Sequence, residues 1–277
     1  VQRVTKMLPL IKEKSKLPDI LKQEVNYWVL KTKNMKYFID TEFIEGFRKP
    51  LFGKKRHFID LISIGIYRED GKFLYLISNE YNFNDADEWV KNNVIMPAYK
   101  SYVSGDARNR LDTTNFHKYL GYSNEEIKNK LLDFFGCWRD VLFYRAPEDI
   151  EVYGYYADYD WVLFCSLFGR MIDLPKGFPM YCKDLKQILD ETLLNYKKTV
   201  KYFDTERRMA FSGNFEELAF ADSIKEKEID LSKYDLKYKL DFMKKYHSGY
   251  PKQENEHNAL GDAKWNFNLF QFIQGLK

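Results

Sequence analysis

Two acidic residues separated by one position follow an apolar run near the beginning of the chain. The segment YFIDTEFIE contains Asp40 and Glu42 on either side of Thr41. On a β-strand, side chains two positions apart face the same way, so Asp40 and Glu42 project together while Thr41 points to the other face. Two unpaired carboxylates on one face repel each other unless a cation lies between them. The oxygen-ligand preference of Mg²⁺ and Mn²⁺ therefore predicts a divalent-metal site at this strand.

A third acid is predicted from the segment YYADYDW in the middle of the chain, which contains Asp158 and Asp160. Aromatic and aliphatic residues surround Asp160 and indicate the start of a helix packed on a sheet. We therefore choose Asp160 as the site residue, and we interpret Asp158 as a solvated or capping acid.

The segment HNALGD near the end of the chain adds His257 and Asp262. In one continuous helix, residues five apart point about 140° away from each other. Both can reach one site only if His257 lies on the loop that precedes the helix. Histidine titrates near neutrality, which suits a general base. The combination of carboxylates and one histidine predicts two-metal phosphoryl transfer, the chemistry of a nuclease.

The elements that must position these residues follow from hydrophobic periodicity and turn signals. We predict strands over residues 36–43, 58–67, 72–78, 150–155 and 180–182, and helices over residues 87–93, 124–138, 159–168, from 183 to about 194, and 258–272. Ser123 and Glu126 form a capping box for the second of these helices. Residues 197–255 are charged and weakly periodic, so we interpret them as an insertion with one or two helices. A β-hairpin sheet followed by βα units predicts one mixed α/β layered structure.

In these residues the chain resembles the DEDDh 3′-to-5′ exonucleases of the RNase H-like fold. Asp40 and Glu42 match the first family motif, Tyr159-Asp160 the second, and His257, Ala259 and Asp262 the third. The resemblance implies an α/β fold with a mixed β-sheet flanked by helices and carrying insertions. It also implies that Asp40, Glu42, Asp160 and Asp262 hold two Mg²⁺ or Mn²⁺ ions while His257 activates the attacking water.

Within that family, the chain looks most like the bacterial exoribonucleases that include the polyadenylate-specific RNase AS. The likeness covers roughly residues 36–96, 150–195 and 256–274, and it leaves out the segments 1–35, 48–57, 98–150 and 197–255. We therefore expect residues 1–35 to be a basic N-terminal extension. Residues 36–277 are expected to be the exonuclease domain, with insertions near 98–123 and 197–255. Substrate choice and assembly stay open, and a homodimer is one of the assemblies that fit.

Binding a polyanionic substrate requires positive charge, which the body of the chain lacks. The net charge is +3, whereas residues 1–34 hold eight Lys/Arg against three Asp/Glu, so the other 243 residues sum to 3 − 5 = −2. A basic cluster follows the first motif, and we predict that its loop contacts the substrate backbone. The cluster consists of Arg48, Lys49, Lys54, Lys55, Arg56 and His57. We choose Arg48, Lys54, Lys55 and Arg56 as its substrate-binding residues. A solvated basic loop is the equal alternative.

Residues beside the acids are the other candidates for substrate binding. We predict that Thr41 borders the substrate and that Phe43, Tyr159 and Trp161 stack on terminal bases. Trp161 fits a place in the core equally well. The 43 Phe and Tyr residues of the chain are enough both to fill a core and to leave some rings exposed.

Other features of the sequence narrow the class of protein. Cys137, Cys165 and Cys182 are widely spaced without a zinc-binding pattern, and we predict buried thiols in a reducing compartment. The absence of a run of 18 apolar residues predicts a cytoplasmic protein without a membrane segment. RNA with a free 3′ end is the expected substrate. Two alternatives remain: an exodeoxyribonuclease, because the acids act on phosphate and ignore the sugar, and a non-catalytic nucleic-acid-binding module on the same fold.

Overall fold

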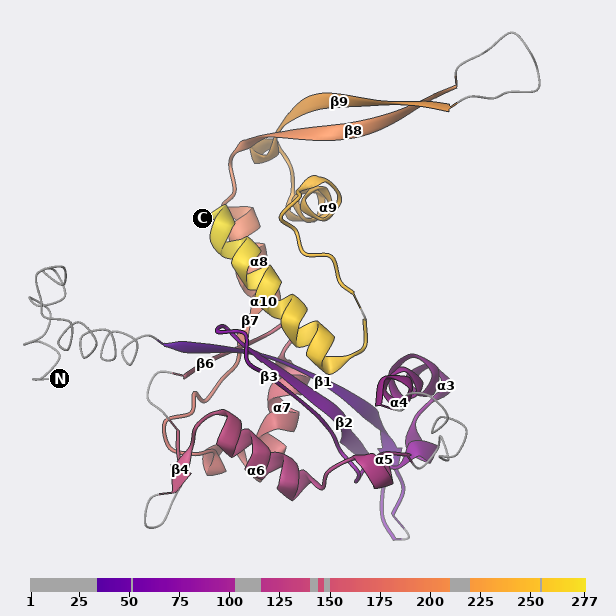
Figure 1. Cartoon of the computed structure of the whole chain (residues 1–277), viewed down its shortest axis with the longest axis vertical. Helices are drawn as coiled ribbons and strands as arrows, with labels where there is room; N and C mark the ends of the chain where they lie inside the picture. The colour runs from indigo at the N-terminus through magenta and orange to yellow at the C-terminus, as the bar shows by residue number, and fades with distance from the viewer. Residues whose placement is uncertain are drawn as a thin grey trace, which may run out of the picture.

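A mixed β-sheet forms the centre of the protein (Figure 1). The computed structural model describes residues 34–50, 52–102, 116–139, 144–146, 150–209, 220–254 and 256–277. Across these residues, the largest sheet has five strands in the order β3-β2-β1-β6-β7. Its strands are β1 Met35–Arg48, β2 Arg56–Arg68, β3 Phe73–Ile77, β6 Ile150–Gly154 and β7 Lys183–Asp184. β2 runs antiparallel to β1 and β3, whereas β6 runs parallel to both β1 and β7.

Helices cover both faces of this sheet, and two separate hydrophobic cores result. On one face, α6 and α7 pack against β1 and β2; on the other face, α8, α9 and α10 form the second core (Figure 1). The helices of the described residues are α3 Glu88–Val90, α4 Met96–Tyr102, α5 Phe116–Leu120, α6 Asn124–Phe134, α7 Asp158–Ser166, α8 Leu185–Leu194, α9 Leu236–Tyr246 and α10 Ala259–Leu276. The predicted α/β architecture, a mixed sheet flanked by helices, is confirmed. None of these helices combines the length and the apolar character needed to span a bilayer.

The central strand β1 shows the alternation that the sequence predicts. Tyr37 and Ile39 are buried in the core beneath α6 and α7, whereas Phe38 is buried in the core beneath α10. Side chains that alternate in this way place Asp40 and Glu42 on the α10 face and Thr41 on the α7 face. β1 continues to Arg48, beyond its predicted end, with a register irregularity between Glu42 and Phe43.

A third core lies at the far end of β1 and β2, beneath a helical segment longer than predicted. The sequence predicts a helix over residues 87–93, but α3 continues through the π-helix η3 Lys91–Ile95 into α4. Ile44, Ile62 and Ile95 are fully buried in this core. The helical segment from α3 to α4 therefore packs against β1 close to the first acidic motif.

Two local predictions are wrong. The helix predicted to reach residue 138 ends at Phe134, because Gly136 adopts a positive φ of 69° and turns the chain away. Trp138 then starts the short strand β4 Trp138–Arg139, which pairs with β5 Tyr144–Arg145. The last strand of the sheet, predicted over residues 180–182, lies at β7 instead.

The segment 197–255 contains a β-hairpin that the sequence analysis did not predict. β8 Thr199–Met209 pairs antiparallel with β9 Phe220–Asp230, and the two extend away from the sheet (Figure 1). At the base of the hairpin Val200 and Tyr202 are partly buried against α9 while Lys201 is exposed. Lys201 pairs with Glu226 at 2.9 Å. Many residues of the two strands are charged, so the sequence lacks the alternation of apolar and polar residues that identifies a half-buried strand.

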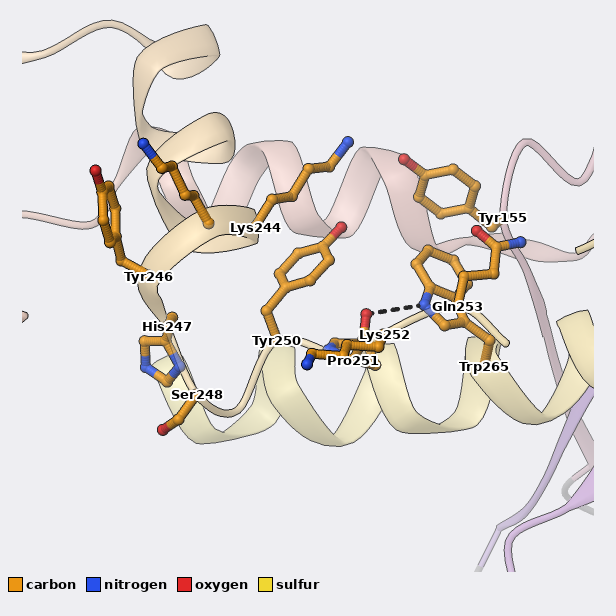
Figure 2. Close-up of a pocket in the computed structure, with 11 residues that line it drawn as sticks. Tyr155, Lys244, Tyr246, His247, Ser248, Tyr250, Pro251, Lys252, Gln253 and Trp265 are labelled. Carbon is orange, nitrogen blue, oxygen red and sulfur yellow. Dashed lines mark hydrogen bonds between the residues drawn. The ribbon is translucent and has the colours of Figure 1, made fainter. Parts of the chain in front are cut away.

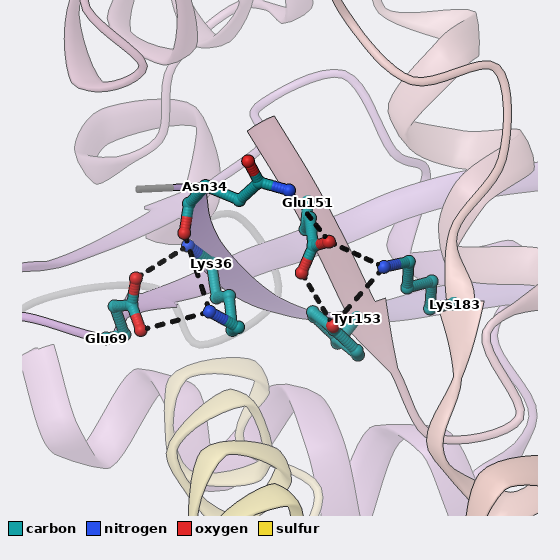
Figure 3. A network of polar contacts seen from close by, with 6 residues as sticks. All are labelled: Asn34, Lys36, Glu69, Glu151, Tyr153 and Lys183. Atoms are coloured by element: carbon teal, nitrogen blue, oxygen red, sulfur yellow. Dashed lines mark hydrogen bonds and ion pairs between the residues drawn. The ribbon is translucent and has the colours of Figure 1, made fainter. Parts of the chain in front are cut away.

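A polar network ties the beginnings of β1 and β6 to β7 (Figure 3). Glu151 accepts hydrogen bonds from Lys183 at 2.7 Å, Tyr153 at 2.7 Å and Asn34 at 3.1 Å. Burial acts to raise the pKa of Glu151, but these hydrogen bonds outweigh it and lower the pKa to about 2. Lys36 pairs with Glu69 at the same edge, at 3.4 Å. These contacts lie at the opposite end of β1 from the basic cluster and hold the strand in register.

The cysteines fit the predicted thiols in part. Cys165 is buried, whereas Cys137 and Cys182 are partly buried, and all three are free. Burial raises the pKa of Cys165 to about 11 and that of Cys137 to about 12.

Candidate active site

Three carboxylates meet between the middle of β1 and the start of α10. One oxygen from each of Asp40, Glu42 and Asp262 lies within 4.8 Å of the other two. Asp40 and Glu42 are partly buried and Asp262 is buried. The pair on β1 faces α10 as the alternation predicts, and α10 supplies the third acid from its first turn. The structure thus brings together three of the four acids predicted as metal ligands.

The first turn of α10 reaches β1 because Gly65 on β2 leaves room for it. Gly65 is the register partner of Asp40, and a Cβ atom on Gly65 would lie 2.2 Å from the backbone of Ala259. Farther along α10, the buried side-chain amide of Asn266 donates to the carbonyl oxygen of Ile39 at 2.9 Å. A side chain at Gly65 would therefore push away the turn that carries Asp262.

Asp160 lies beside this cluster and is held by Thr41. Its Oδ1 accepts hydrogen bonds from the backbone N–H of Thr41 at 2.8 Å and from the Thr41 hydroxyl at 2.6 Å. Thr41 is buried, and its hydroxyl is committed to this carboxylate. The prediction that the Thr41 side chain borders the substrate is therefore corrected: Thr41 positions Asp160. Asp158, set aside by the sequence analysis, is exposed.

His257 lies on the loop that precedes α10, where the spacing argument requires it. Its backbone N–H donates to Oδ2 of Asp262 at 3.0 Å, and its ring packs edge-on against Trp89 with centroids 4.8 Å apart. The next residue, Asn258, caps α10 by accepting from the N–H of Gly261 at 3.0 Å. His257 and Asp262 thus share one site although they are five positions apart.

Two neighbours of this site were not predicted. The side-chain amide of Gln253 donates to Oδ1 of Asp262 at 2.6 Å, opposite the contact with His257. Trp89 carries the ring against which His257 packs. Gln253 lies in the segment interpreted as an insertion, so neither a motif nor a period could have identified it. For Trp89, the only signal in the sequence was a weak one: a tryptophan among the polar residues of the helix predicted over residues 87–93.

Backbone strain accompanies two of the three motifs. Among the described residues, the non-glycine positions with positive φ are Tyr156 at 55° and His257 at 64°. Tyr156 shortly precedes Asp160, and His257 shortly precedes Asp262. Such a conformation costs on the order of 1–3 kcal/mol and persists only where surrounding contacts enforce it. The helices that deliver both acids therefore begin at strained junctions.

The acids lack compensating charge, and their pKa values rise. Burial, followed by the charges of the neighbouring acids, raises the pKa of Asp40 well above its usual range and that of Glu42 to about 8. Burial raises the pKa of Asp160 to about 6 although the hydrogen bonds from Thr41 oppose it. Burial also raises the pKa of Asp262. No described lysine or arginine contributes to the shifts of Asp40 and Glu42. A divalent cation bound by these oxygens removes the repulsion, so the donor set fits Mg²⁺ or Mn²⁺.

A cavity opens beside Glu42, between β1 and α3. We call it the Trp89 cavity; it has a volume of about 530 Å³ and is lined by Glu42, Phe43, Glu45, Gly46, Phe47, His57, Asp87, Trp89, Val90 and Val94. The rings of Phe43 and Tyr159 lie 5.4 Å apart at its border. Tyr159 is 44% exposed, and its hydroxyl donates to Glu45 at 3.2 Å. Phe43 is partly buried against the core beneath α6 and α7. Stacking of Phe43 and Tyr159 on a base stays a prediction.

Trp161 has no such role. It is 9% exposed and belongs to the core beneath α6 and α7, where it stacks on Phe164 with centroids 5.1 Å apart. The prediction that Trp161 stacks on a base is wrong, because its ring faces are covered by the core. The alternative named for it, a place in the core, is correct.

The basic cluster after the first motif is only partly a loop. Arg48 ends β1 and is paired in register with Arg56, which begins β2. The guanidinium of Arg48 donates to Asp85 at 2.9 Å and to Asp60 at 3.3 Å. The loop prediction is therefore wrong for Arg48 and Arg56, and Arg48 already has two acidic partners. Lys54 and Lys55 are exposed between the strands, and their contact with substrate stays a prediction.

Comparison with known proteins decides the family. A 3′-5′ exoribonuclease of Mycobacterium tuberculosis, present in two strains, is 31% identical over 157 residues, which cover 57% of this chain and 75% of the relative. The chain belongs to the DEDD family of 3′-5′ exoribonucleases. No family model matches it. Among solved structures, Schizosaccharomyces pombe Pop2p in its Mg²⁺- and Mn²⁺-bound form aligns with a TM-score of 0.43 and 14% identity, covering 92% of this chain and 89% of Pop2p.

The raised pKa values of this exoribonuclease-family site predict how pH affects the metal-free protein. The pKa of Glu42 rises from 4.5 to about 8 on folding. The folded state therefore holds the proton more tightly, and stability that is present below pH 4.5 is lost as the pH rises through 8. We expect Glu42→Gln to remove much of this loss and to stabilise the metal-free protein by about 1–3 kcal/mol at pH 9.

Urea unfolding at pH 5 and pH 9 in the presence of a chelator measures this effect. Mn²⁺ should stabilise the unsubstituted protein at pH 9, and it should stabilise Glu42→Gln less because one ligand is lost. Equal stability of the metal-free protein at the two pH values would contradict the prediction.

Proposed function

We propose that the protein is a metal-dependent 3′-to-5′ exoribonuclease that removes nucleotides from RNA with a free 3′ end. The observation that carries this proposal is the group of three carboxylates, within 4.8 Å of one another, beside His257. Exoribonucleases among the relatives favour RNA over DNA as the substrate. All five DEDDh positions are filled, which argues against a non-catalytic binding module.

Two divalent ions, Mg²⁺ or Mn²⁺, fit the four acids. Asp40, Glu42 and Asp262 would hold a divalent ion between them, and Asp160 would add a fourth carboxylate for the second ion. Bound there, the ions supply activation of a water molecule and stabilisation of the charge on the leaving oxygen. Thr41 keeps Asp160 oriented, and the N–H groups of Gln253 and His257 hold the carboxylate of Asp262 in place.

His257 is the proposed general base. Its backbone is fixed by the hydrogen bond to Asp262, and Trp89 limits rotation of its ring. The imidazole would then accept the proton of the attacking water.

The Trp89 cavity is the proposed place of the 3′-terminal nucleotide. It begins at Glu42, so a nucleotide in it would leave its phosphate at the acids, and the ring of Phe43 offers a stacking surface. The exposed Lys54 and Lys55 are proposed to contact the backbone from the neighbouring loop.

One assay tests the reaction, its direction and the choice of sugar. The protein is incubated with Mn²⁺ or Mg²⁺ and with 5′-labelled RNA and DNA of one sequence, each with a free or a blocked 3′ end. We expect a ladder of shortening products from RNA with a free 3′ end, none when a chelator is present, and strong inhibition by the 3′ block. A ladder from DNA alone would replace the proposal by the exodeoxyribonuclease alternative. Binding without any products would replace it by the binding module.

A further inference from the structure

A second cavity lies between the end of α9 and the side of α10. It has a volume of about 470 Å³, and we call it the lysine cavity (Figure 2). Lys244, Tyr250 and Lys252 line it from α9 and the following loop, while Tyr155 and Trp265 line it from the sheet side and α10. Most of its lining belongs to the segment that has no counterpart in the family motifs.

The lining is positively charged. Lys244, Lys245 and Lys252 contribute three ammonium groups, and no carboxylate is found among the described residues that line the cavity. His247 does not add to this charge, because burial lowers its pKa and its Nδ1 accepts a hydrogen bond from the backbone N–H of Gly249 at 3.1 Å. The cavity therefore concentrates positive charge on a protein whose body is slightly acidic, and its chemistry suits a phosphate group.

Aromatic groups and an unused hydroxyl complete this lining. The rings of Tyr155 and Trp265 pack edge to face with centroids 5.1 Å apart, and the Trp265 indole N–H donates to the carbonyl of Pro251 at 3.1 Å. The Tyr250 hydroxyl is buried and has no hydrogen-bond partner within the described structure. Figure 2 shows the amine of Lys244 on the same side of the loop as the hydroxyls of Tyr155 and Tyr250. A buried hydroxyl without a partner is costly, and a bound phosphate oxygen would accept its hydrogen bond.

One residue that lines the lysine cavity contacts the acidic cluster. Gln253 lies at its edge and donates to Oδ1 of Asp262, while His257, next to the Trp89 cavity, donates to Oδ2. Trp265 follows Asp262 by three residues, about 4.5 Å along the helix axis. Gln253, which lines the lysine cavity, and His257, which packs against Trp89 of the other cavity, therefore contact the two oxygens of Asp262.

We propose that the lysine cavity binds the phosphodiester backbone of RNA upstream of the bond that is cut. The inference rests on the proposed function: with the 3′-terminal nucleotide in the Trp89 cavity, the chain that continues in the 5′ direction leaves past Gln253 and meets Lys244 and Lys252. The aromatic rings beside these lysines offer surfaces for the attached bases. Contacts of this kind favour long RNA over short RNA without changing the chemistry at the acids.

Binding measurements with the full chain test this role. The probe is a 5′-fluorescent 20-nucleotide RNA, bound to protein that carries Asp40→Asn to prevent degradation, over a series of KCl concentrations. We expect the pair Lys244→Glu and Lys252→Glu to weaken binding at least about tenfold and to reduce the salt dependence by roughly 1.4 in log K per log [salt], the value for two phosphate contacts on a single strand. Lys237→Glu is the matched control: it is exposed on α9 outside the cavity, and its effect should be under about twofold.

Turnover separates upstream binding from a structural defect. With the acids intact, the double variant should lose kcat/KM for the 20-nucleotide RNA while it keeps kcat/KM for a dinucleotide, and the Lys244→Arg, Lys252→Arg pair should restore the loss. Equal salt dependence for all variants would overturn the inference, as would an equal loss on both substrates.

Competition by inorganic phosphate or a mononucleotide at this cavity, without an effect on long RNA, would assign it to a free anion and also overturn the inference. Absence of cleavage by every form of the protein would instead overturn the proposed function, because the binding series does not depend on turnover.

Discussion

Asp40→Asn is expected to lower the rate of RNA cleavage at least about 10³-fold while the protein keeps its fold, because losing one ligand of the metal centre removes several kcal/mol of transition-state stabilisation. The amide fills the same volume as the carboxylate but cannot carry its charge. Burial raises the pKa of Asp40, and the charges of the three other acids raise it further. The substitution therefore removes a repulsive buried charge and should not destabilise the metal-free protein.

The matched control is Asp158→Asn, which makes the same chemical change at an exposed acid on the same helix as Asp160. Its cleavage rate should stay within about twofold of the unsubstituted protein, since surface changes away from special contacts have small effects. Single-turnover cleavage rates, Mn²⁺ titration by calorimetry and circular dichroism measure activity, metal binding and fold. Comparable activity of Asp40→Asn and the unsubstituted protein would remove Asp40 from the site.

Much of the site could be predicted because its positions follow from local periodicity. The two-residue period of a strand placed Asp40 and Glu42 on one face, and the structure brings Asp262 to that same face. Helix geometry required His257 to precede α10, and the structure places it immediately before the capping residue Asn258. Such arguments need only neighbouring residues and the geometry of one element.

The parts that could not be predicted depend on contacts between distant segments. Gln253 reaches Asp262 only after the loop from α9 has folded along α10, and its place in the sequence carries no periodic signal. The burial of Trp161 depends on α6, which ends at Phe134, 27 positions before it. Arg48 was predicted in a loop but lies in a strand. The pairing of β1 with β2 continues past the apolar run that the sequence shows and includes Arg48 and Arg56.

The structure also explains why one site needs two strained residues. Tyr156 and His257 each turn the chain sharply before a helix that presents an acid in its first turn. Helix N-termini favour negative charge, which offsets part of the cost of bringing carboxylates together. In the metal-free protein the remaining repulsion between the carboxylates raises their pKa values. A bound cation removes this repulsion, so the relief of repulsion contributes to the free energy of metal binding.

Replacing His257 by asparagine is expected to lower kcat about 10²- to 10⁴-fold, the range for loss of a general base, with little change in KM for RNA. Asparagine tolerates the left-handed backbone conformation better than alanine does, so the positive φ at this position and the N–H bond to Asp262 should be kept. The substitution then tests the imidazole alone. Metal affinity should be unchanged, which distinguishes His257 from the four acids.

Rescue by added imidazole completes the test. His257→Ala leaves a space beside Trp89 that a free imidazole molecule can occupy, so added imidazole should restore part of the lost turnover to His257→Ala and none to Asp40→Asn. Trp89→Ala should lower kcat less than His257→Asn does, because it releases the ring of His257 without removing it. Full activity of His257→Asn would overturn the assignment of the base and would leave the acids to act on water without a proton acceptor from this loop.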